Sequence, residues 1–223
     1  MEDIKRITLF MGHYGSGKTN AAVNYAIMLK NKGLDTAIYD LDIVNPYFRT
    51  VDGKSILDKS GVKLIASPYA ASNVDIPAMA AGNYAMVDDK TLHAVVDVGG
   101  DDRGALALGR YAAEIVQENN YDMLLVFNKY RFETKDIQGA LQIKEEIETA
   151  CNMKFTAIVN NSNLGAETTI NTVLDSVKFA EELAKATGLK VKFTTCKNDL
   201  YDELKKFINN LMPMQLIKYG AWQ

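Results

Sequence analysis

The sequence predicts an α/β protein in which a doubly wound, mostly parallel sheet carries helices on both of its faces. Short runs of apolar and β-branched residues alternate along the chain with longer segments of helical periodicity. Continuous hydrophobic runs are typical of strands buried on both faces, and parallel strands need helices between them as crossovers. The 223 residues contain no internal repeat and no linker rich in Pro, Gly and Ser. We therefore expect one domain spanning residues 1–223.

The expected elements alternate in chain order. The strands are short apolar segments at residues 7–12, 35–42, 62–67, 92–100, 122–128, 154–161 and 190–196. The helices are longer and carry apolar residues at helical spacing, at residues 18–33, 105–117, 134–150, 167–186 and 200–211. The first helix is apolar on most faces, which predicts that it is largely buried, and Gly33 ends it. Residues expected to face inward in the third and fourth helices are Ile137, Leu141, Ile147, Ile170, Val173, Leu174, Val177 and Ala184.

The composition is that of an ordinary globular protein, and it argues against a nucleic-acid surface and a membrane span. Hydrophobic residues make up 48%, and 25 basic and 28 acidic residues give a net charge of −3. No stretch concentrates Lys and Arg as a nucleic-acid surface would, and no apolar run approaches the length of a membrane span. Cys151 and Cys196 lie outside any C-x-x-C pair, which favours buried thiols in a reducing compartment over a zinc site. With no secretory apolar segment at the N-terminus, the sequence predicts a soluble cytoplasmic protein without a membrane span.

The segment "GHYGSGKT", residues 12–19, fits the pattern G-x-x-x-x-G-K-[ST] of a phosphate-binding loop. A predicted strand precedes it and a predicted helix follows it, as that pattern requires. Its glycines allow a sharp turn, and the backbone N–H groups of residues 15–19 meet the positive end of the helix in an anion site. Lys18 is expected to reach the β- and γ-phosphates, and the Thr19 hydroxyl to bind Mg²⁺. The nucleotide-binding residues expected here are Gly12, Gly15, Ser16, Gly17, Lys18, Thr19 and Asn20.

Carboxylates follow two of the predicted strands. "VVDVGGDD" places Asp97 after an apolar run, and Gly100 comes three residues later. This is the form of a second nucleotide motif, in which the Asp orders a metal-bound water and the glycine N–H faces the γ-phosphate. "IYDLD" ends another strand with Asp40 and Asp42, which are two residues apart and so share a face.

Together these segments resemble the ParA/MinD/Mrp group of P-loop ATPases, which includes CobQ- and CobB-type domains and the nitrogenase iron protein. "GHYGSGKT", "DLD", "DVGG" and "IVNNSN" occur in the order of that group and cover nearly the whole chain. The resemblance implies the P-loop NTPase fold, bound ATP and Mg²⁺, and a homodimer. It also implies that Asp42 positions the hydrolytic water, that Asp40 lies near Lys18, and that Asn161, with Asn160 as a close second, recognises adenine. The implied catalytic residues are Asp42, Lys18 and Asp40, and the implied metal ligands are Thr19, Asp42 and Asp97.

The first motif departs from the usual loop of the group, K-G-G-x-G-K-[ST], whose first lysine reaches the partner's phosphates across a dimer. His13, Tyr14 and Gly15 occupy the first three positions here, so this lysine is absent. Arg103, just after the second motif, is an alternative source of charge. Arg49, in the segment "NPYFR", is a second candidate, although Pro46 and the two aromatic residues also suit a plain packed loop.

The sequence favours adenine over guanine as the base. Guanine-binding proteins use [NT]-K-x-D, whose carboxylate accepts from the base. "NKYR" has Arg131 at the position of that Asp, and "CKND" has Cys196 at its first position.

The C-terminal segment 207–222 invites comparison with the membrane-binding tails of MinD-like proteins, but it carries one lysine and Pro213. We expect it to contact the body of the protein or a dimer partner.

Three functions remain open from the sequence. The first is a Mg²⁺-dependent ATPase that switches conformation. The second is a small-molecule kinase or CobB-type ATP-dependent enzyme, for which the irregular segment 68–91 is the available acceptor-site material. The third is an adaptor that binds nucleotide without hydrolysis and acts through an unidentified protein partner. The aspartates favour the first function, and the missing loop lysine favours the third.

Overall fold

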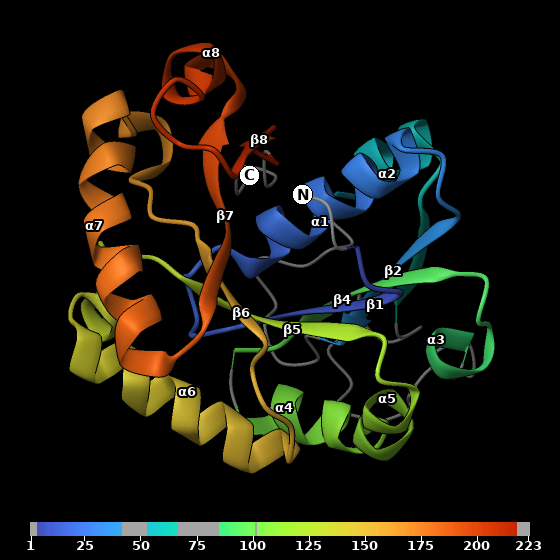
Figure 1. The fold of residues 1–223 in the computed structure, drawn as a ribbon. Coiled ribbons are helices and arrows are strands. Elements are labelled where there is room, and N and C mark those ends of the chain that lie inside the picture. The colour runs from blue at the N-terminus through green and yellow to red at the C-terminus, as the bar shows by residue number, and fades with distance from the viewer. Residues whose placement is uncertain (1–3, 42–52, 67–84, 101, 218–223) are drawn as a thin grey trace, which may run out of the picture.

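The computed structural model describes residues 4–41, 53–66, 85–100 and 102–217 (Figure 1). These residues form three layers, a central sheet with helices on each face. Among the described residues, no helix combines the length and the apolar character needed to cross a membrane.

Eight strands of the described chain form one sheet in the order β3-β2-β4-β1-β5-β6-β7-β8. Every neighbouring pair is parallel. The strands are β1 (Ile7–Met11), β2 (Thr36–Leu41), β3 (Lys63–Ala66), β4 (His93–Val98), β5 (Tyr121–Phe127), β6 (Ala157–Asn160), β7 (Lys190–Lys197) and β8 (Leu211–Met214). Because all of them run in one direction, their carboxyl ends meet at one edge of the sheet, where the following loops can build a site. The predicted fold class is confirmed.

The helices divide between the two faces of the sheet. They are α1 (Lys18–Asn31), α2 (Lys54–Ser60), α3 (Ala85–Asp88), α4 (Asp102–Gly109), α5 (Ala112–Glu118), α6 (Ile137–Cys151), α7 (Ile170–Thr187) and α8 (Tyr201–Leu204). Apolar side chains of α1 and α2 join one core cluster, whereas α3, α4 and α5 join the cluster on the opposite face. Figure 1 shows α1 and α2 on one side of the strands and α4, α5 and α6 on the other.

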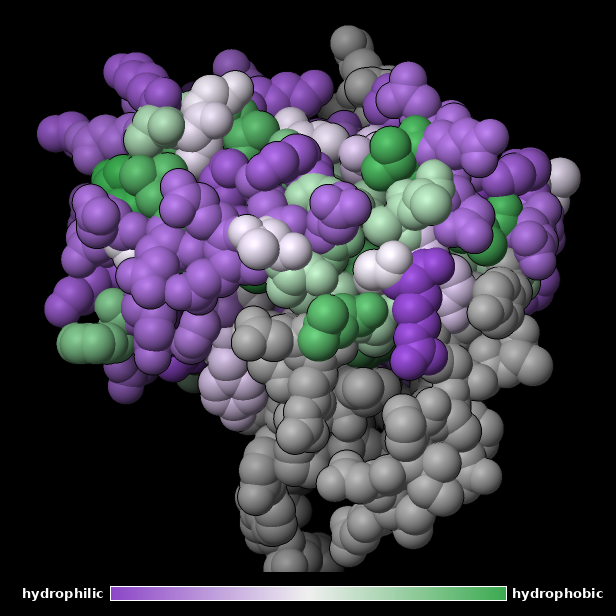
Figure 2. Space-filling view, turned by 90° about the horizontal axis from the view of Figure 1, so that it is seen from below, coloured by the Kyte–Doolittle hydropathy of each residue, from purple (hydrophilic) through white to green (hydrophobic). Residues whose placement is uncertain are grey.

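The surface on the side of helices α4, α5 and α6 is largely polar. Figure 2 views the molecule from below; over the coloured part of this face hydrophilic side chains predominate, with a smaller group of hydrophobic residues near its centre. Two hydrophobic side chains of this layer, Leu106 and Val116, are exposed. Single exposed apolar residues are normal on a protein surface, so most of the apolar area of these helices is turned toward the sheet.

Helix α1 is buried along most of its length, as predicted. Its buried apolar residues are Ala21, Ala22, Val23, Tyr25, Ala26 and Leu29. The Tyr25 ring lies between two aromatic rings, with centroid distances of 5.4 Å to Phe10 and 5.9 Å to Phe193. The helix therefore packs across several strands, and this packing fixes where its N-terminus lies.

The predicted continuous helix 105–117 is wrong, because the structure has two helices, α4 and α5, in its place. The chain turns after Gly109, and the N–H of Tyr111 donates to the carbonyl of Leu108 at 2.9 Å. Glycine is a poor helix former, and the turn leaves Leu108 and Tyr111 buried in the same cluster. Burial of both side chains thus outweighs helical continuity.

The predicted helix 200–211 is also wrong beyond its first turn. It ends at Leu204, and residues 211–214 form the edge strand β8 beside β7. Pro213 is exposed in this strand, and an edge strand tolerates a proline because one side of its backbone has no neighbour. Met212, Met214 and Ile217 join the core beneath α1. Packing against the body is thus confirmed for residues 211–217, and residues 218–222 of the predicted segment lie outside the described residues.

The inward face of α6 agrees with the prediction in part. Ile137, Leu141 and Ile147 are partly buried, and Ile137 and Ile147 pack against core clusters as predicted. The helix lies between α4 and α7, so its buried side is set by two neighbours as well as by the sheet. Its fully buried apolar residues are Ala140, Ile143 and Cys151.

Candidate functional site

The segment between β1 and α1 is a loop that only glycine can form at several positions. Gly12, Gly15 and Gly17 have φ values of +151°, +77° and +83°. A Cβ at Gly12 would lie 2.2 Å from the carbonyl oxygen of Val126 in β5. The glycines that the motif predicts are thus required by backbone conformation and, at Gly12, by the neighbouring strand.

The N-terminus of α1 is built to meet an anion. No side chain caps it, its first turn contains no acidic residue, and it begins with Lys18. Uncapped N–H groups and the helix dipole both favour a negative ligand there. The Ser16 hydroxyl is buried and makes no hydrogen bond with the described residues, so the loop also has a polar group for a ligand to engage.

Lys18 lies folded over this loop. Its side chain is 6% exposed, and Nζ donates to the carbonyl of His13 at 3.4 Å. The N–H of Ser16 donates to the same carbonyl at 3.1 Å. The ammonium group is therefore held at the mouth of the loop by backbone geometry.

The end of β4 closes against the loop at Gly100. A Cβ at this residue would lie 2.8 Å from the backbone nitrogen of Tyr14, 2.9 Å from Nζ of Lys18 and 3.0 Å from the carbonyl oxygen of Gly12. The second motif and the first, far apart in sequence, thus meet around the lysine ammonium. The predicted contact of the Gly100 N–H with a γ-phosphate stays a prediction.

Asp40 and Asp97 lie side by side on neighbouring strands. They are register partners in β2 and β4, and they are 5% and 0% exposed. Ile38 and Val95, two residues earlier in each strand, pack in the cluster beneath α1. Because side chains alternate along a strand, both carboxylates face the α1 side of the sheet. Mg²⁺ prefers oxygen ligands such as carboxylates, so this pair of aspartates suits a divalent cation.

Asn161 connects the loop to the far strands. Its Nδ2 donates to the carbonyl of Ser16 at 2.6 Å, and its Oδ1 accepts from the Thr195 hydroxyl at 2.6 Å. Asn160, the close second candidate, instead donates to the Ser176 hydroxyl at 2.8 Å. These contacts give Asn161 a part in holding the loop, and its predicted contact with adenine stays a prediction.

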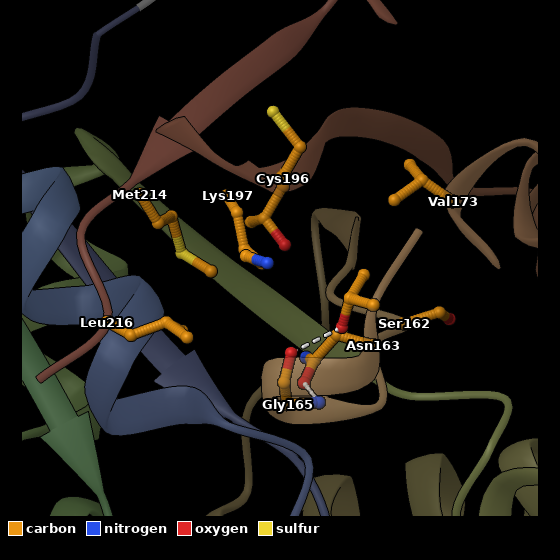
Figure 3. Close-up of a pocket in the computed structure, with 10 residues that line it drawn as sticks. Ser162, Asn163, Gly165, Val173, Cys196, Lys197, Met214 and Leu216 are labelled. Carbon is orange, nitrogen blue, oxygen red and sulfur yellow. Dashed lines mark hydrogen bonds between the residues drawn. The ribbon is translucent and has the colours of Figure 1, made fainter. Parts of the chain in front are cut away.

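A pocket opens beside the loop at the carboxyl ends of β6, β7 and β8 (Figure 3). In Figure 3, Met214 and Leu216 lie on one side of it, and Asn163 and Gly165 on the other. The turn that carries Asn163 is fixed locally, because its Oδ1 accepts from the N–H of Gly165 at 3.1 Å. The lining residues are Ser162, Asn163, Gly165, Thr168, Val173, Thr195, Cys196, Lys197, Met214 and Leu216.

Two chemical properties of this pocket bear on a ligand. Its lining contains amide, hydroxyl and ammonium groups but, among the described residues, no carboxylate. Burial raises the pKa of the Cys196 thiol to about 12, so this side chain stays protonated and uncharged. Its burial, like that of Cys151, agrees with the prediction of buried thiols.

The loop after β5 also touches the phosphate loop. Nε of Arg131 donates to the carbonyl of Gly15 at 3.0 Å. Glu133 Oε2 lies 3.8 Å from Nδ1 of His13. In the sequence Arg131 stands out only as the wrong residue in a guanine motif, whereas in the fold it lies on the predicted nucleotide loop.

Several predicted residues lie outside the described part of the chain. These are Asp42 and Arg49 in residues 42–52, the side chain of Arg103, and residues 67–84 of the irregular segment. Within the described residues, no three His, Cys, Asp or Glu side chains are grouped closely enough to hold a metal ion on their own.

The sequence alone did not indicate Asn163, Thr195, Lys197 or the contact of Arg131 with the phosphate loop. The run "NNSN" at a strand end and the lysine of "CKND" are the available signals for the pocket. Both follow neighbouring strands, but only the strand order shows that they face each other.

Comparisons with known proteins agree with this geometry. A family model described as the CobQ/CobB/MinD/ParA nucleotide binding domain matches residues 7–188. Comparison with curated proteins found no significant match.

Solved structures share the fold at low sequence identity. The cell division protein FtsY from Thermotoga maritima is 19% identical, with a TM-score of 0.58 over 87% of this chain and 63% of that one. The signal recognition particle receptor FtsY from Elizabethkingia anophelis is 17% identical, with a TM-score of 0.52 over 84% and 57%. The signal recognition particle 54 kDa protein from Aeropyrum pernix K1, in complex with GDP, is 16% identical, with a TM-score of 0.52 over 86% and 41%. The chain thus spans less than two thirds of the length of these structures.

Proposed function

The chain belongs to the CobQ/CobB/MinD/ParA nucleotide-binding family and has the fold of a P-loop NTPase, and on this basis we propose that it binds Mg-ATP and hydrolyses it to switch conformation. The observation that carries the proposal is that residues of the two nucleotide motifs meet at the N-terminus of α1. There Gly100 adjoins the Lys18 ammonium, and Asp40 and Asp97 lie on the same face of the sheet. A loop that binds anions beside two buried carboxylates suits a phosphate chain and its cation.

Each residue has a separate task in this proposal. Lys18 neutralises charge on the β- and γ-phosphates, and the N–H groups of the loop hold their oxygens. The Thr19 hydroxyl and Asp97 would hold Mg²⁺, and Asp40 lies beside Asp97. Mg²⁺ keeps several waters and uses few protein ligands besides phosphate, so the lack of a described three-residue metal cluster is compatible with it. When bound, the ion would neutralise charge that develops on the phosphates.

Asp42 keeps the role of orienting the attacking water as a prediction from the sequence. A test is the variant Asp42→Ala, which should bind ATP like the wild type and release phosphate more slowly. Unchanged turnover would move this role to another residue.

The pocket beside Asn163 is the proposed base site. Guanine presents two adjacent donors and needs a carboxylate acceptor, whereas adenine presents a donor beside an acceptor, which one amide can match. The described lining offers the Asn163 amide and no carboxylate, which supports ATP over GTP. The enclosed volume is only about 10 Å³, room for about one water, so a base would have to displace Met214 and Leu216 away from Asn163 and Gly165.

Nucleotide binding is tested by titration calorimetry with Mg-ATP and Mg-GTP. We expect ATP to bind more tightly and Lys18→Ala to abolish binding of both. The matched control is Lys30→Ala, which removes a lysine at the other end of the same helix, where it pairs with Asp35 at 3.2 Å. Equal ATP affinity in Lys18→Ala and Lys30→Ala would remove the loop from the proposal.

Hydrolysis is tested by phosphate release at several protein concentrations, with Lys18→Ala as the blank. Turnover above the blank supports the ATPase. Turnover that rises more than linearly with protein supports a homodimer that completes the site. Tight ATP binding without turnover would favour the non-hydrolysing adaptor.

A further inference from the structure

Arg131 is the feature of the site that the proposed function does not yet use. Its Nε donates to the carbonyl of Gly15 at 3.0 Å. A Cβ at Gly15 would lie 3.6 Å from this Nε and 3.9 Å from Cδ and Cζ. The guanidinium therefore lies over the middle of the phosphate loop, where it is hydrogen-bonded to the Gly15 carbonyl and where a side chain at residue 15 would touch it.

The position of Arg131 is fixed by the turn that carries it. The carbonyl of Asn128 accepts from the N–H of Arg131 at 3.0 Å and from the buried Thr134 hydroxyl at 2.6 Å. The Asn128 side chain ties this turn to the next loop, because Nδ2 donates to the carbonyl of Asn163 at 3.0 Å. The Tyr130 hydroxyl donates to the carbonyl of Thr172 at 2.8 Å. A turn held at this many points presents its arginine in one place.

The charge of Arg131 has no carboxylate partner among the described residues. Glu133, two residues later, lies close to His13 rather than to the arginine, with Oε2 3.8 Å from Nδ1 of His13. An arginine is always protonated, and its Nη groups remain as donors once Nε is used. An exposed cation anchored on an anion-binding loop is suited to a phosphate oxygen.

We propose that Arg131 contacts the terminal phosphates of the nucleotide bound to its own chain. The inference rests on the proposed nucleotide site and adds a second cation to it. A nucleoside triphosphate carries more negative charge than one lysine and one divalent cation balance, and guanidinium groups serve this purpose in phosphoryl transfer, either from the same chain or from a partner. The contact with Gly15 lies within one chain, which assigns the same-chain form.

Binding of ATP, ADP and AMP to Arg131→Ala tests the contact. We expect ATP affinity to fall about tenfold, as for loss of a charge-assisted hydrogen bond, ADP affinity to fall less, and AMP affinity to stay unchanged. Arg131→Lys keeps the charge but loses the paired donors of the guanidinium. Its ATP affinity should lie between those of Arg131→Ala and the wild type. Equal losses for all three nucleotides, with faster hydrogen exchange in the empty loop, would mean that Arg131 only shapes the loop and would overturn the inference.

The matched control is Lys129→Ala. Lys129 lies in the same turn, but its Nζ donates to the carbonyl of Asp175 at 2.9 Å, on α7. We expect its ATP affinity to match the wild type, and the wild-type slope of affinity against salt should become shallower in Arg131→Ala only. An equal change in both variants would reduce the effect to general surface charge and contradict the contact.

A mixing experiment separates the same chain from a partner. Arg131→Ala is titrated with ATP in the presence of excess Lys18→Ala, which binds no nucleotide and keeps its arginine. If ATP affinity is not recovered, the same-chain contact is supported; recovery would overturn it in favour of a partner's arginine.

The two proposals can be told apart by their failure. A wild-type chain that binds no nucleotide would contradict both, whereas equal ATP affinity in the wild type and Arg131→Ala would contradict only the role of Arg131.

Discussion

At the scale of single residues, position 12 accepts only glycine because neighbouring atoms leave no room for a side chain. Its φ is +151°, and a Cβ would lie 2.2 Å from a carbonyl oxygen of β5, which can move only with the strand. We expect Gly12→Ala to lower the free energy of unfolding by about 3 kcal/mol and to abolish nucleotide binding. Urea denaturation and calorimetry measure the two effects.

Gly33→Ala is the control for this substitution. Gly33 has a φ of +83°, but nothing lies within 4 Å of the position of its Cβ. Only backbone strain of about 1 kcal/mol is expected, with unchanged affinity for ATP. Similar losses of stability in both variants would show that the contact with β5 contributes little.

Asn161 gives a second prediction at this scale, because both ends of its amide are used. Asn161→Ala removes the bonds to Ser16 and Thr195 and leaves buried partners unsatisfied, so we expect a loss of about 2 kcal/mol in unfolding free energy. ATP affinity should fall as well, because the loop loses an anchor. Thr195→Val keeps the bond to Ser16 and should retain most of the affinity; an equal loss of affinity in both variants would argue against the loop as the cause.

The residues of the loop were predictable and several of their partners were not. Lys18, Thr19 and the glycines follow from spacing within eight residues, and Gly100 follows from its distance to Asp97. The contacts of Arg131 and Thr195 depend on which strand ends are neighbours in space. That information is in the strand order and not in any local pattern.

At the scale of elements, the apolar runs located the long strands because a parallel sheet buries both faces. Among the failures were β8 and the break between α4 and α5. Residues 211–214 carry Pro213, which local propensity excludes from strands, but pairing with β7 and burial of the neighbouring methionines outweigh it. Tertiary packing decided both elements.

A network of hydrogen bonds and an ion pair connects the start of β1 to helices α3 and α5. The Arg6 guanidinium donates to Glu118 at the end of α5. It also donates to the carbonyls of Met86, Asp89 and Leu92, at 3.0, 3.1 and 3.2 Å. One buried arginine thus joins α3, β4 and α5 around the first strand.

This network predicts a pH dependence of stability. The hydrogen bond from Arg6 lowers the pKa of Glu118 from 4.5 to about 2. A carboxylate with a lowered pKa stabilises the fold above pH 4.5, and the stabilisation is lost as the pH falls toward 2. We expect Glu118→Gln to lower the free energy of unfolding by about 3 kcal/mol at pH 7 and by little at pH 2. Urea denaturation across this range measures it, with exposed Glu114→Gln as the control; a pH-independent loss would point to packing.

At the scale of the whole molecule, α1 couples the site to the sheet. The cluster beneath it includes residues of β1, β2, β4, β5, β6, β7 and β8. A ligand held at the N-terminus of α1 therefore stabilises an element on which most of the described sheet packs. Binding energy should appear in global unfolding and not only in the loop.

We therefore propose that residues 1–223 unfold as one unit, and calorimetry with and without Mg-ATP tests this. A single transition is expected, with equal calorimetric and van't Hoff enthalpies. ATP at about 100 times its Kd should add about 2.7 kcal/mol, which raises Tm by about 5–10 °C for a chain of this size. Lys18→Ala should unfold in one transition that ATP does not shift. Two transitions, of which ATP moves only one, would divide the chain into two units and confine the effect of the nucleotide to the one that holds α1.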